Sequence, residues 1–155
     1  MYRRAMVRSR TLAAAVLIIG AATAAASAAD KVRVQILAIR ATTSNTKISP
    51  ELKSLASKLK KDFKYTGYTL EKKTGGTIEI GKSKSYSLVG PYSAVVQPTA
   101  KGSRIKLKFE LRERTGKTSK KKLSTTLSLK PGKSQILGRW SLGKGDVLIL
   151  AVSAK

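Results

Sequence analysis

The feature that most constrains the fold is an alternation of apolar and polar side chains, which dominates the chain after residue 64. The clearest apolar positions are Ile105, Leu107, Phe109 and Leu111, followed by Leu123, Leu127 and Leu129. Successive side chains of a strand point to opposite faces, so this pattern predicts strands with one face in a core and the other in water. The C-terminal two thirds of the chain is therefore predicted to be antiparallel β-structure.

Turn signals divide this region into short strands. They are Thr74–Gly76, Gly90–Pro91, Pro98, Pro131–Gly132 and Gly143–Asp146. Glycine and proline at these points predict that a strand ends at each one. The last run, VLILAVSA, is apolar on both faces, which is typical of a central strand. We expect it to lie near the first strand and the helix described next.

The segment KVRVQILAIRA (31–41) begins as an alternating strand, but Leu37 and Ile39 make its second face apolar as well. Something must therefore cover that face. The next segment, ISPELKSLASKLKKDF, has Ser49 as a candidate N-cap, Pro50 at the first helical position and apolar residues at helical spacing. We expect one amphipathic helix here that covers the strand. A basic amphipathic helix can also lie on an anionic membrane, but the neighbouring apolar strand favours the covering role.

These elements predict an α+β fold, mainly an antiparallel β-sheet with one amphipathic helix near the mature N-terminus. The sequence leaves two arrangements open, a half-open barrel and a two-layer sandwich. The lone tryptophan, Trp140, is expected to pack against the sheet, as most tryptophans do.

The first 29 residues have the layout of a secretory signal peptide. Four arginines precede an Ala-rich apolar stretch that ends in Ala26-Ser27-Ala28. We expect cleavage before Ala29 or Asp30, leaving residues 30–155 as a single α+β domain in the periplasm or outside the cell; an uncleaved membrane anchor is the alternative. Loss of those four arginines from a net charge of +24 leaves +20 on the mature chain.

The chain contains neither cysteine nor histidine. A disulfide framework, a Ser-His-Asp triad, a Cys-His pair and the usual zinc and copper sites are thereby excluded. Its eight acidic residues form no glycosidase or calcium-binding motif. We therefore expect a non-enzymatic protein that has no catalytic residues, cofactor or metal.

The segment KLSTTLSLKPGKSQILGRWSLGKGDVLILAVSAK reads as a strand, a glycine turn, a short strand ending at Gly138 and a final apolar strand. It resembles the end of the secretin-like domain of type II and type III secretion outer-membrane proteins. In that family an I-x-G-G step precedes further strands, and Arg139 stands here at the second glycine. The mature region also resembles small exported bacterial β-domain proteins of undefined function. These resemblances imply a cell-envelope or secreted β-domain that derives from secretion machinery or docks onto it.

Nine of the 32 lysines and arginines lie between residues 104 and 123. The candidate anion-binding residues are Arg104, Lys106, Lys108, Arg112, Arg114, Lys117, Lys120, Lys121 and Lys122. The alternation places this charge on a hairpin, with a loop starting at Thr115 and with Lys120–Lys122 leading into the partner strand. The bland interpretation is that lysine serves only as the solvent-exposed residue of the chain and blunts the sheet edges.

Two functions follow as hypotheses. The first is a binding or adaptor domain that contacts an anionic polysaccharide, lipopolysaccharide or lipid head groups through this basic surface. The second is a structural accessory of a secretion or envelope assembly that pairs a sheet edge with an envelope protein. Sequence-specific nucleic-acid recognition is not favoured, because the candidate stacking residues, the tyrosines and Trp140, lie outside the basic stretch. No transmembrane span is expected once the signal is removed.

Overall fold

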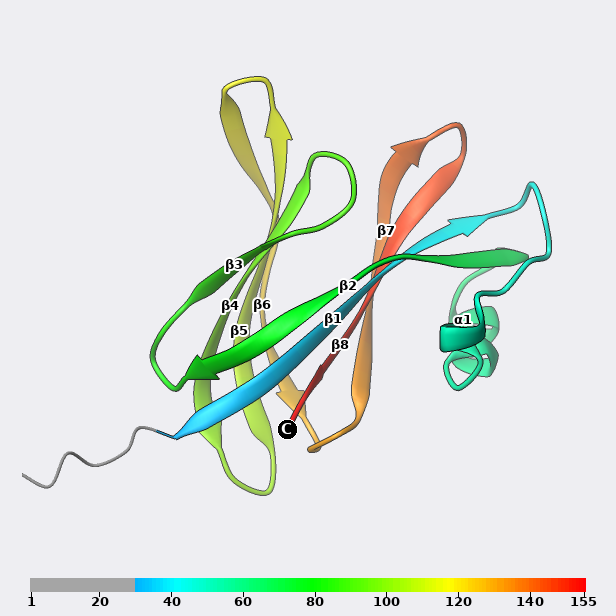
Figure 1. The fold of residues 1–155 in the computed structure, drawn as a ribbon. Helices are drawn as coiled ribbons and strands as arrows, with labels where there is room; N and C mark the ends of the chain where they lie inside the picture. The colour runs from blue at the N-terminus through cyan, green and yellow to red at the C-terminus, as the bar shows by residue number, and fades with distance from the viewer. Residues whose placement is uncertain (1–29) are drawn as a thin grey trace, which may run out of the picture.

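The computed structural model describes residues 30–155 (Figure 1). The predicted signal peptide, with its cleavage expected before Ala29 or Asp30, therefore lies outside the described residues. The described chain forms two four-stranded antiparallel sheets, which we call sheet A, in the order β2-β1-β8-β7, and sheet B, in the order β3-β4-β5-β6. The strands are β1 (Lys31–Thr42), β2 (Gly67–Glu79), β3 (Lys84–Ser87), β4 (Tyr92–Lys101), β5 (Ile105–Thr115), β6 (Thr118–Leu129), β7 (Ser134–Gly143) and β8 (Asp146–Ala154).

The two sheets pack face to face over one apolar core and do not close into a barrel, so the arrangement is a sandwich. The alternating residues of both sheets supply this core, as the sequence predicted. Ile105, Leu107 and Leu111 are fully buried, and the exposed residues between them point away from the core. Trp140 is partly buried against the same core, which confirms its expected role in sheet packing.

A second apolar cluster lies on the outer face of sheet A. Ile39 of β1 and Ile149 of β8 pack there against Leu52 and Leu59 of the segment that follows β1. The chain therefore covers the apolar second face of its first strand with the next segment, as predicted. In Figure 1 this segment, with α1, lies beside one end of sheet A. The strand β8 pairs with both β1 and β7, which confirms its predicted central position.

The predicted helix is shorter than expected. A 3₁₀ turn, η1 (Pro50–Leu52), comes first, and the α-helix α1 spans only Ala56–Asp62. Ser49 makes no side-chain cap. Instead its Oγ accepts a hydrogen bond from the Leu70 N–H at 2.9 Å, and its own N–H donates to the Tyr68 carbonyl at 2.9 Å. Ser49 thus occupies the N-cap position of η1, followed by Pro50 as predicted, but its side chain binds β2 and does not cap the turn.

Two predicted turns are also wrong. Thr74–Gly76 runs inside β2, opposite Val34–Ile36 of β1. Gly75 has a φ of +148°, and a Cβ on it would lie 2.1 Å from the Val34 carbonyl oxygen, so only glycine lets the strands approach this closely. Pro98 lies inside β4 at an irregularity in its pairing with β5, where a missing N–H is tolerated.

Within residues 30–155, no helix has both the length and the apolar character needed to cross a membrane.

Candidate functional site

The basic stretch forms the β5–β6 hairpin, and its turn is tighter than the sequence suggested. Only Gly116 and Lys117 separate β5 from β6, and Gly116 has a φ of +62° that suits a residue without a Cβ. Lys120, Lys121 and Lys122 already belong to β6. Their backbone is thus held in the sheet, and they do not lie in a loop.

The outer face of sheet B is polar along the middle of this hairpin. Lys106 and Lys108 are exposed between buried neighbours, opposite Ser128 and Thr126 of β6. A shallow hollow of about 650 Å³ lies on this face. Its polar lining includes Gln97, Lys108, Glu110, Ser124 and Thr126. The face therefore combines ammonium groups with hydroxyl and amide groups. Phe109 borders the hollow, but its ring is buried in the core between the sheets.

Two carboxylates neutralise part of the hairpin charge. Glu110 pairs with Arg112 on its own strand and with Lys121 across the sheet, the latter at 3.2 Å. Burial works to raise the pKa of Glu110, but the hydrogen bonds from Lys121 and Arg112 outweigh it, and the pKa is lowered. The Lys122 ammonium lies 2.9 Å from Glu113, and this contact raises the pKa of Lys122. Arg112, Lys121 and Lys122 are therefore already paired with carboxylates and would interact less strongly with an external anion.

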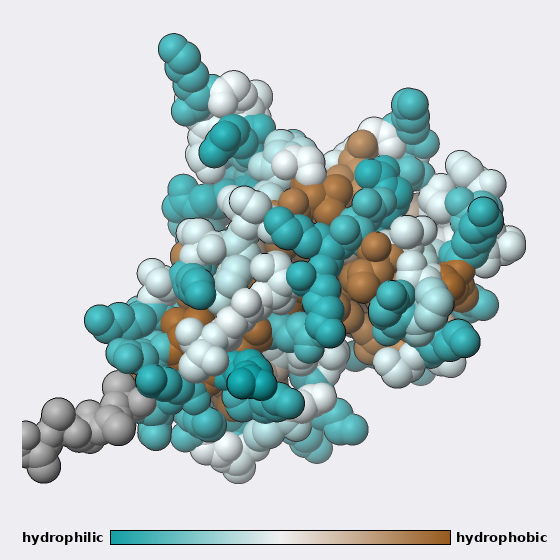
Figure 2. All heavy atoms as spheres, in the orientation of Figure 1, coloured by the Kyte–Doolittle hydropathy of each residue, from teal (hydrophilic) through white to brown (hydrophobic). Residues whose placement is uncertain are grey.

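The tip holds cations that have no such partner. Arg114, Lys117 and Lys120 are exposed and form no ion pair within residues 30–155. Figure 2 shows hydrophilic atoms at the end of this hairpin, which projects from the body of the domain. Lys106, Lys108 and these three tip residues are thus the predicted site residues that remain available for an anion.

Arg104 lies apart from the tip, at the other end of the hairpin. Its Nε donates to Ser128 Oγ at 2.7 Å and its Nη2 donates to the Ser128 carbonyl at 2.6 Å. It lines a small groove of about 240 Å³ together with Lys58, Lys130 and Lys133. Lys58, Lys130 and Lys133 were not among the predicted site residues. The only local signal was the pair of lysines around the Pro131–Gly132 turn, and their approach to Lys58 depends on the tertiary fold.

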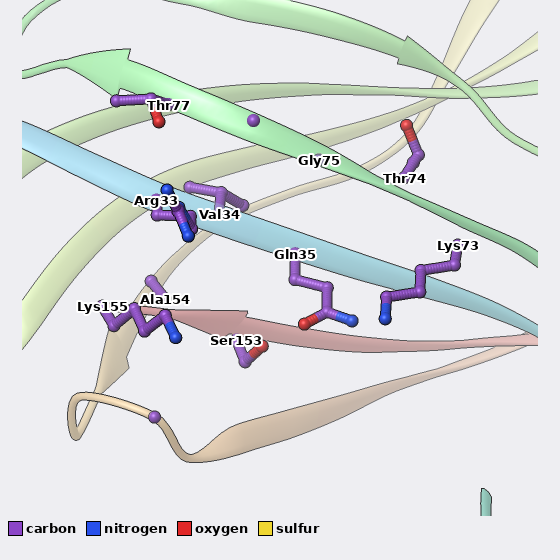
Figure 3. Close-up of a pocket in the computed structure, with 12 residues that line it drawn as sticks. Arg33, Val34, Gln35, Lys73, Thr74, Gly75, Thr77, Ser153, Ala154 and Lys155 are labelled. Carbon is purple, nitrogen blue, oxygen red and sulfur yellow. The ribbon is translucent and has the colours of Figure 1, made fainter. Parts of the chain in front are cut away.

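A larger groove, of about 690 Å³, lies on the outer face of sheet A, beyond the part covered by the helix. Figure 3 shows side chains from β1, β2 and β8 along it, among them Arg33, Gln35, Lys73 and Ser153. Gly75 of β2 also lines this groove, so backbone is exposed along it. None of these residues was among the predicted site residues, and Thr74–Gly76 was predicted as a turn.

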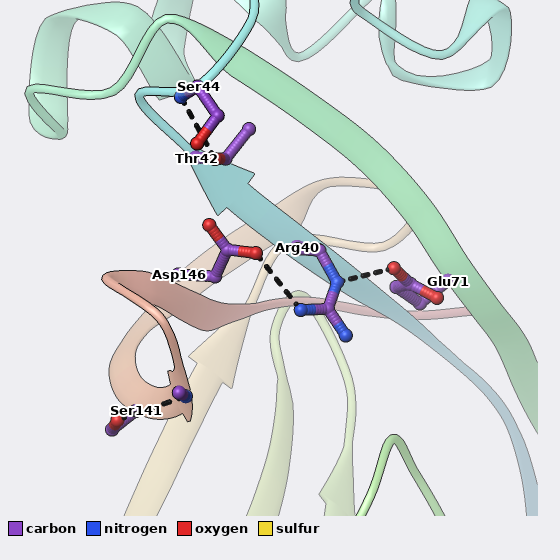
Figure 4. Close-up of polar contacts among 7 residues, drawn as sticks. Arg40, Thr42, Ser44, Glu71, Ser141 and Asp146 are labelled. Atoms are coloured by element: carbon purple, nitrogen blue, oxygen red, sulfur yellow. Dashed lines mark hydrogen bonds and ion pairs between the residues drawn. The ribbon is translucent and has the colours of Figure 1, made fainter.

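A network of charged groups joins three strands of sheet A at its other end (Figure 4). Arg40 of β1 donates from Nε to Glu71 of β2 at 2.6 Å and from Nη1 to Asp146 of β8 at 3.1 Å. The hydrogen bond to Glu71 raises the pKa of Arg40, and the Thr42 hydroxyl and the Arg40 guanidinium lower the pKa of Asp146. Arg40 is paired with two carboxylates from the neighbouring strands, so this network links β1 to β2 and β8.

The described residues include no group of three or more acidic side chains that could hold a metal ion. Exposed cations and neighbouring hydroxyl groups lie together on the outer face of sheet B. Side chains of these kinds can interact with an anion by electrostatic attraction and hydrogen bonds.

The chain matches no family model, and neither a curated protein nor a solved structure matches it significantly. The resemblance of the C-terminal segment to the secretin-like domain stays a prediction.

Proposed function

We propose that this protein is an exported, non-enzymatic binding domain of the cell envelope or the extracellular space. In this proposal, the outer face of sheet B and the tip of the β5–β6 hairpin bind an anionic polymer or lipid head groups. Acidic polysaccharides and lipopolysaccharide are the polyanions that an exported domain meets.

The observation that carries the proposal is the distribution of charge along the hairpin. Glu110 and Glu113 form ion pairs with three cations of the hairpin. The other cations are exposed and have no carboxylate partner in the described part of the chain: Lys106, Lys108, Arg114, Lys117 and Lys120. A strand places alternate side chains about 7 Å apart on one face. Lys106 and Lys108 lie at this spacing on the outer face, and the tip adds Arg114, Lys117 and Lys120. Exposed cations along one hairpin suit an anionic polymer, and release of its counterions favours binding.

The test is retention on immobilised heparin, a sulfated polysaccharide, measured against salt concentration. The hairpin variant replaces Lys106, Lys108, Lys117 and Lys120 with glutamine. The control variant makes the same change at Lys53, Lys60, Lys61 and Lys64, which lie in and around α1. Both variants lose four positive charges. If the hairpin binds the polyanion, the hairpin variant elutes at lower salt than the control. Equal elution of the two variants would show that only net charge matters.

A second function is favoured by one specific observation. The edge strand β7 carries a single charged residue, Arg139, whereas the edge strand β6 carries a run of lysines. Uncharged edges are the ones that accept a further strand. Under this alternative the domain is a structural accessory that pairs β7 with an envelope protein. Capture of a partner that persists at high salt and is displaced by a peptide matching residues 134–143 would support it; capture that salt abolishes would not.

A further inference from the structure

The groove at the base of the β5–β6 hairpin brings together cations from three separate segments. Lys58 comes from α1, Arg104 precedes β5, and Lys130 and Lys133 lie on the turn between β6 and β7. No carboxylate lines this groove among residues 30–155. Like charges repel, and an anion that lies among these four cations would remove that repulsion.

Parts of the groove are held in place before any ligand arrives. The two hydrogen bonds from Arg104 to Ser128 fix the guanidinium plane and use two of its five N–H groups, which leaves the others to donate elsewhere. The turn that carries the two lysines is closed by a hydrogen bond from the Lys133 N–H to the Lys130 carbonyl at 3.0 Å. The Gly132 N–H anchors the same turn to the Ala154 carbonyl at 2.8 Å.

The lining also supplies neutral hydrogen-bonding groups. The side chains of Ser128, Ser134 and Gln135 border the groove beside the cations. Arginine presents a planar fork that matches two oxygens of a phosphate or sulfate, and lysine adds a mobile point charge. At about 240 Å³ the groove is smaller than the pockets that hold drug-sized ligands, and it suits one or two tetrahedral groups.

We propose that this groove binds a tetrahedral oxyanion, a phosphate or sulfate group. The inference rests on the proposed function, because the natural source of such a group would be the anionic polymer or lipid that sheet B contacts. It goes beyond that function by placing a discrete, saturable site at the end of the hairpin opposite its tip. The tip and the outer face, by contrast, offer only distributed charge.

Isothermal titration calorimetry with inorganic pyrophosphate tests this site. The groove variant is Lys130→Gln with Lys133→Gln, and the matched control is Lys72→Gln with Lys82→Gln, two lysines outside both the groove and the hairpin. All four side chains are exposed, and thermal melting establishes that both variants fold. We expect saturable binding by the native chain, at least about tenfold weaker binding by the groove variant, and no change in the control. Absence of saturable binding, or equal weakening in the two variants, would overturn the site.

The source of the oxyanion is tested with heparin and with phosphatidylcholine vesicles that contain phosphatidylglycerol. The groove variant must weaken binding to whichever of the two the native chain binds, and unchanged binding to both contradicts the proposal. The two hypotheses also fail separately. Heparin retention that depends on the hairpin, without saturable pyrophosphate binding, leaves the proposed function standing and removes the groove. Pyrophosphate binding in the groove, with heparin retention that follows net charge alone, leaves the groove standing and removes the proposed function of the hairpin.

Discussion

The outer faces of the two sheets differ in what the chain does with them. On sheet A, apolar residues such as Ile39 and Ile149 reach the outer face, and the segment with η1 and α1 covers them. On sheet B, the outer face carries lysines, serines and threonines, and no helix covers it in the described structure. The comparison shows that the fold covers a face where burial is favourable and leaves open the face where charge gathers. The covered face serves stability, and we assign binding to the open one.

The largest expected effect comes from uncovering the face of sheet A. Leu59 of α1 is fully buried against that face. Leu59→Ala should lower the free energy of unfolding by about 2–5 kcal/mol, since it removes buried methyl groups and leaves a cavity. Lys108→Ala, on the open face of sheet B, should change it by no more than about 0.5 kcal/mol. Urea denaturation measures both. Comparable losses would break the distinction between a covered face and an open one.

A smaller effect is expected from the charged network of sheet A. Asp146→Asn should cost about 0.5–1 kcal/mol at neutral pH, because its partner Arg40 is partly exposed and solvent screens the pair. The pKa of Asp146 is lowered in the folded state. Its contribution is therefore present above the unfolded value of ~3.9 and is lost as the pH falls through the folded pKa.

Denaturation at a series of pH values between neutral and strongly acidic checks this sign. The Asp146→Asn variant should lose less stability below about pH 4 than the native chain does. An identical acid dependence in the two proteins would mean that the carboxylate is not held ionised by its neighbours.

The two hairpins that extend from the sheets also differ. The β5–β6 hairpin turns at Gly116, whereas the β7–β8 hairpin contains two non-glycine residues with positive φ, Arg139 at +98° and Lys144 at +55°. The backbone at Arg139 is strained, since side chains with a Cβ disfavour that region. Arg139→Gly should therefore raise stability by a few tenths to about 1 kcal/mol, seen as a higher melting temperature. A lower melting temperature would show that the side chain of Arg139 stabilises the fold in some other way.

Local pattern was enough to predict most of the strands, but it left open whether they form a half-open barrel or a sandwich. Strict alternation at Ile105–Leu111 fixed the inner face of β5, and the double apolar face of β1 required a cover. The predictions that were wrong concern residues whose role is set by contacts with distant parts of the chain. The Ser49 side chain bonds to β2 although the residue stands at the N-cap of η1, and Gly75 permits close approach of two strands and does not make a turn.

The candidate site was predicted in part for the same reason. The tip and the outer face of the hairpin follow from alternation along one segment. The ion pairs of Glu110 and Glu113 depend on the register between β5 and β6, which is shifted next to Leu111. The groove at Arg104 requires α1 and two strand ends to meet, and spacing along the sequence contains no signal for that meeting.

The central claim is that the basic hairpin, and not net charge alone, binds a polyanion. The most direct measurement is the heparin binding constant across a range of salt concentrations for the native chain, the four-lysine hairpin variant and the four-lysine control variant. Each bound lysine contributes about 0.7–0.9 to the slope of log K against log salt for nucleic acids, so a similar polyanion predicts a loss of roughly three in the hairpin variant. The control should keep the native slope. Equal slopes in the two variants would contradict the claim.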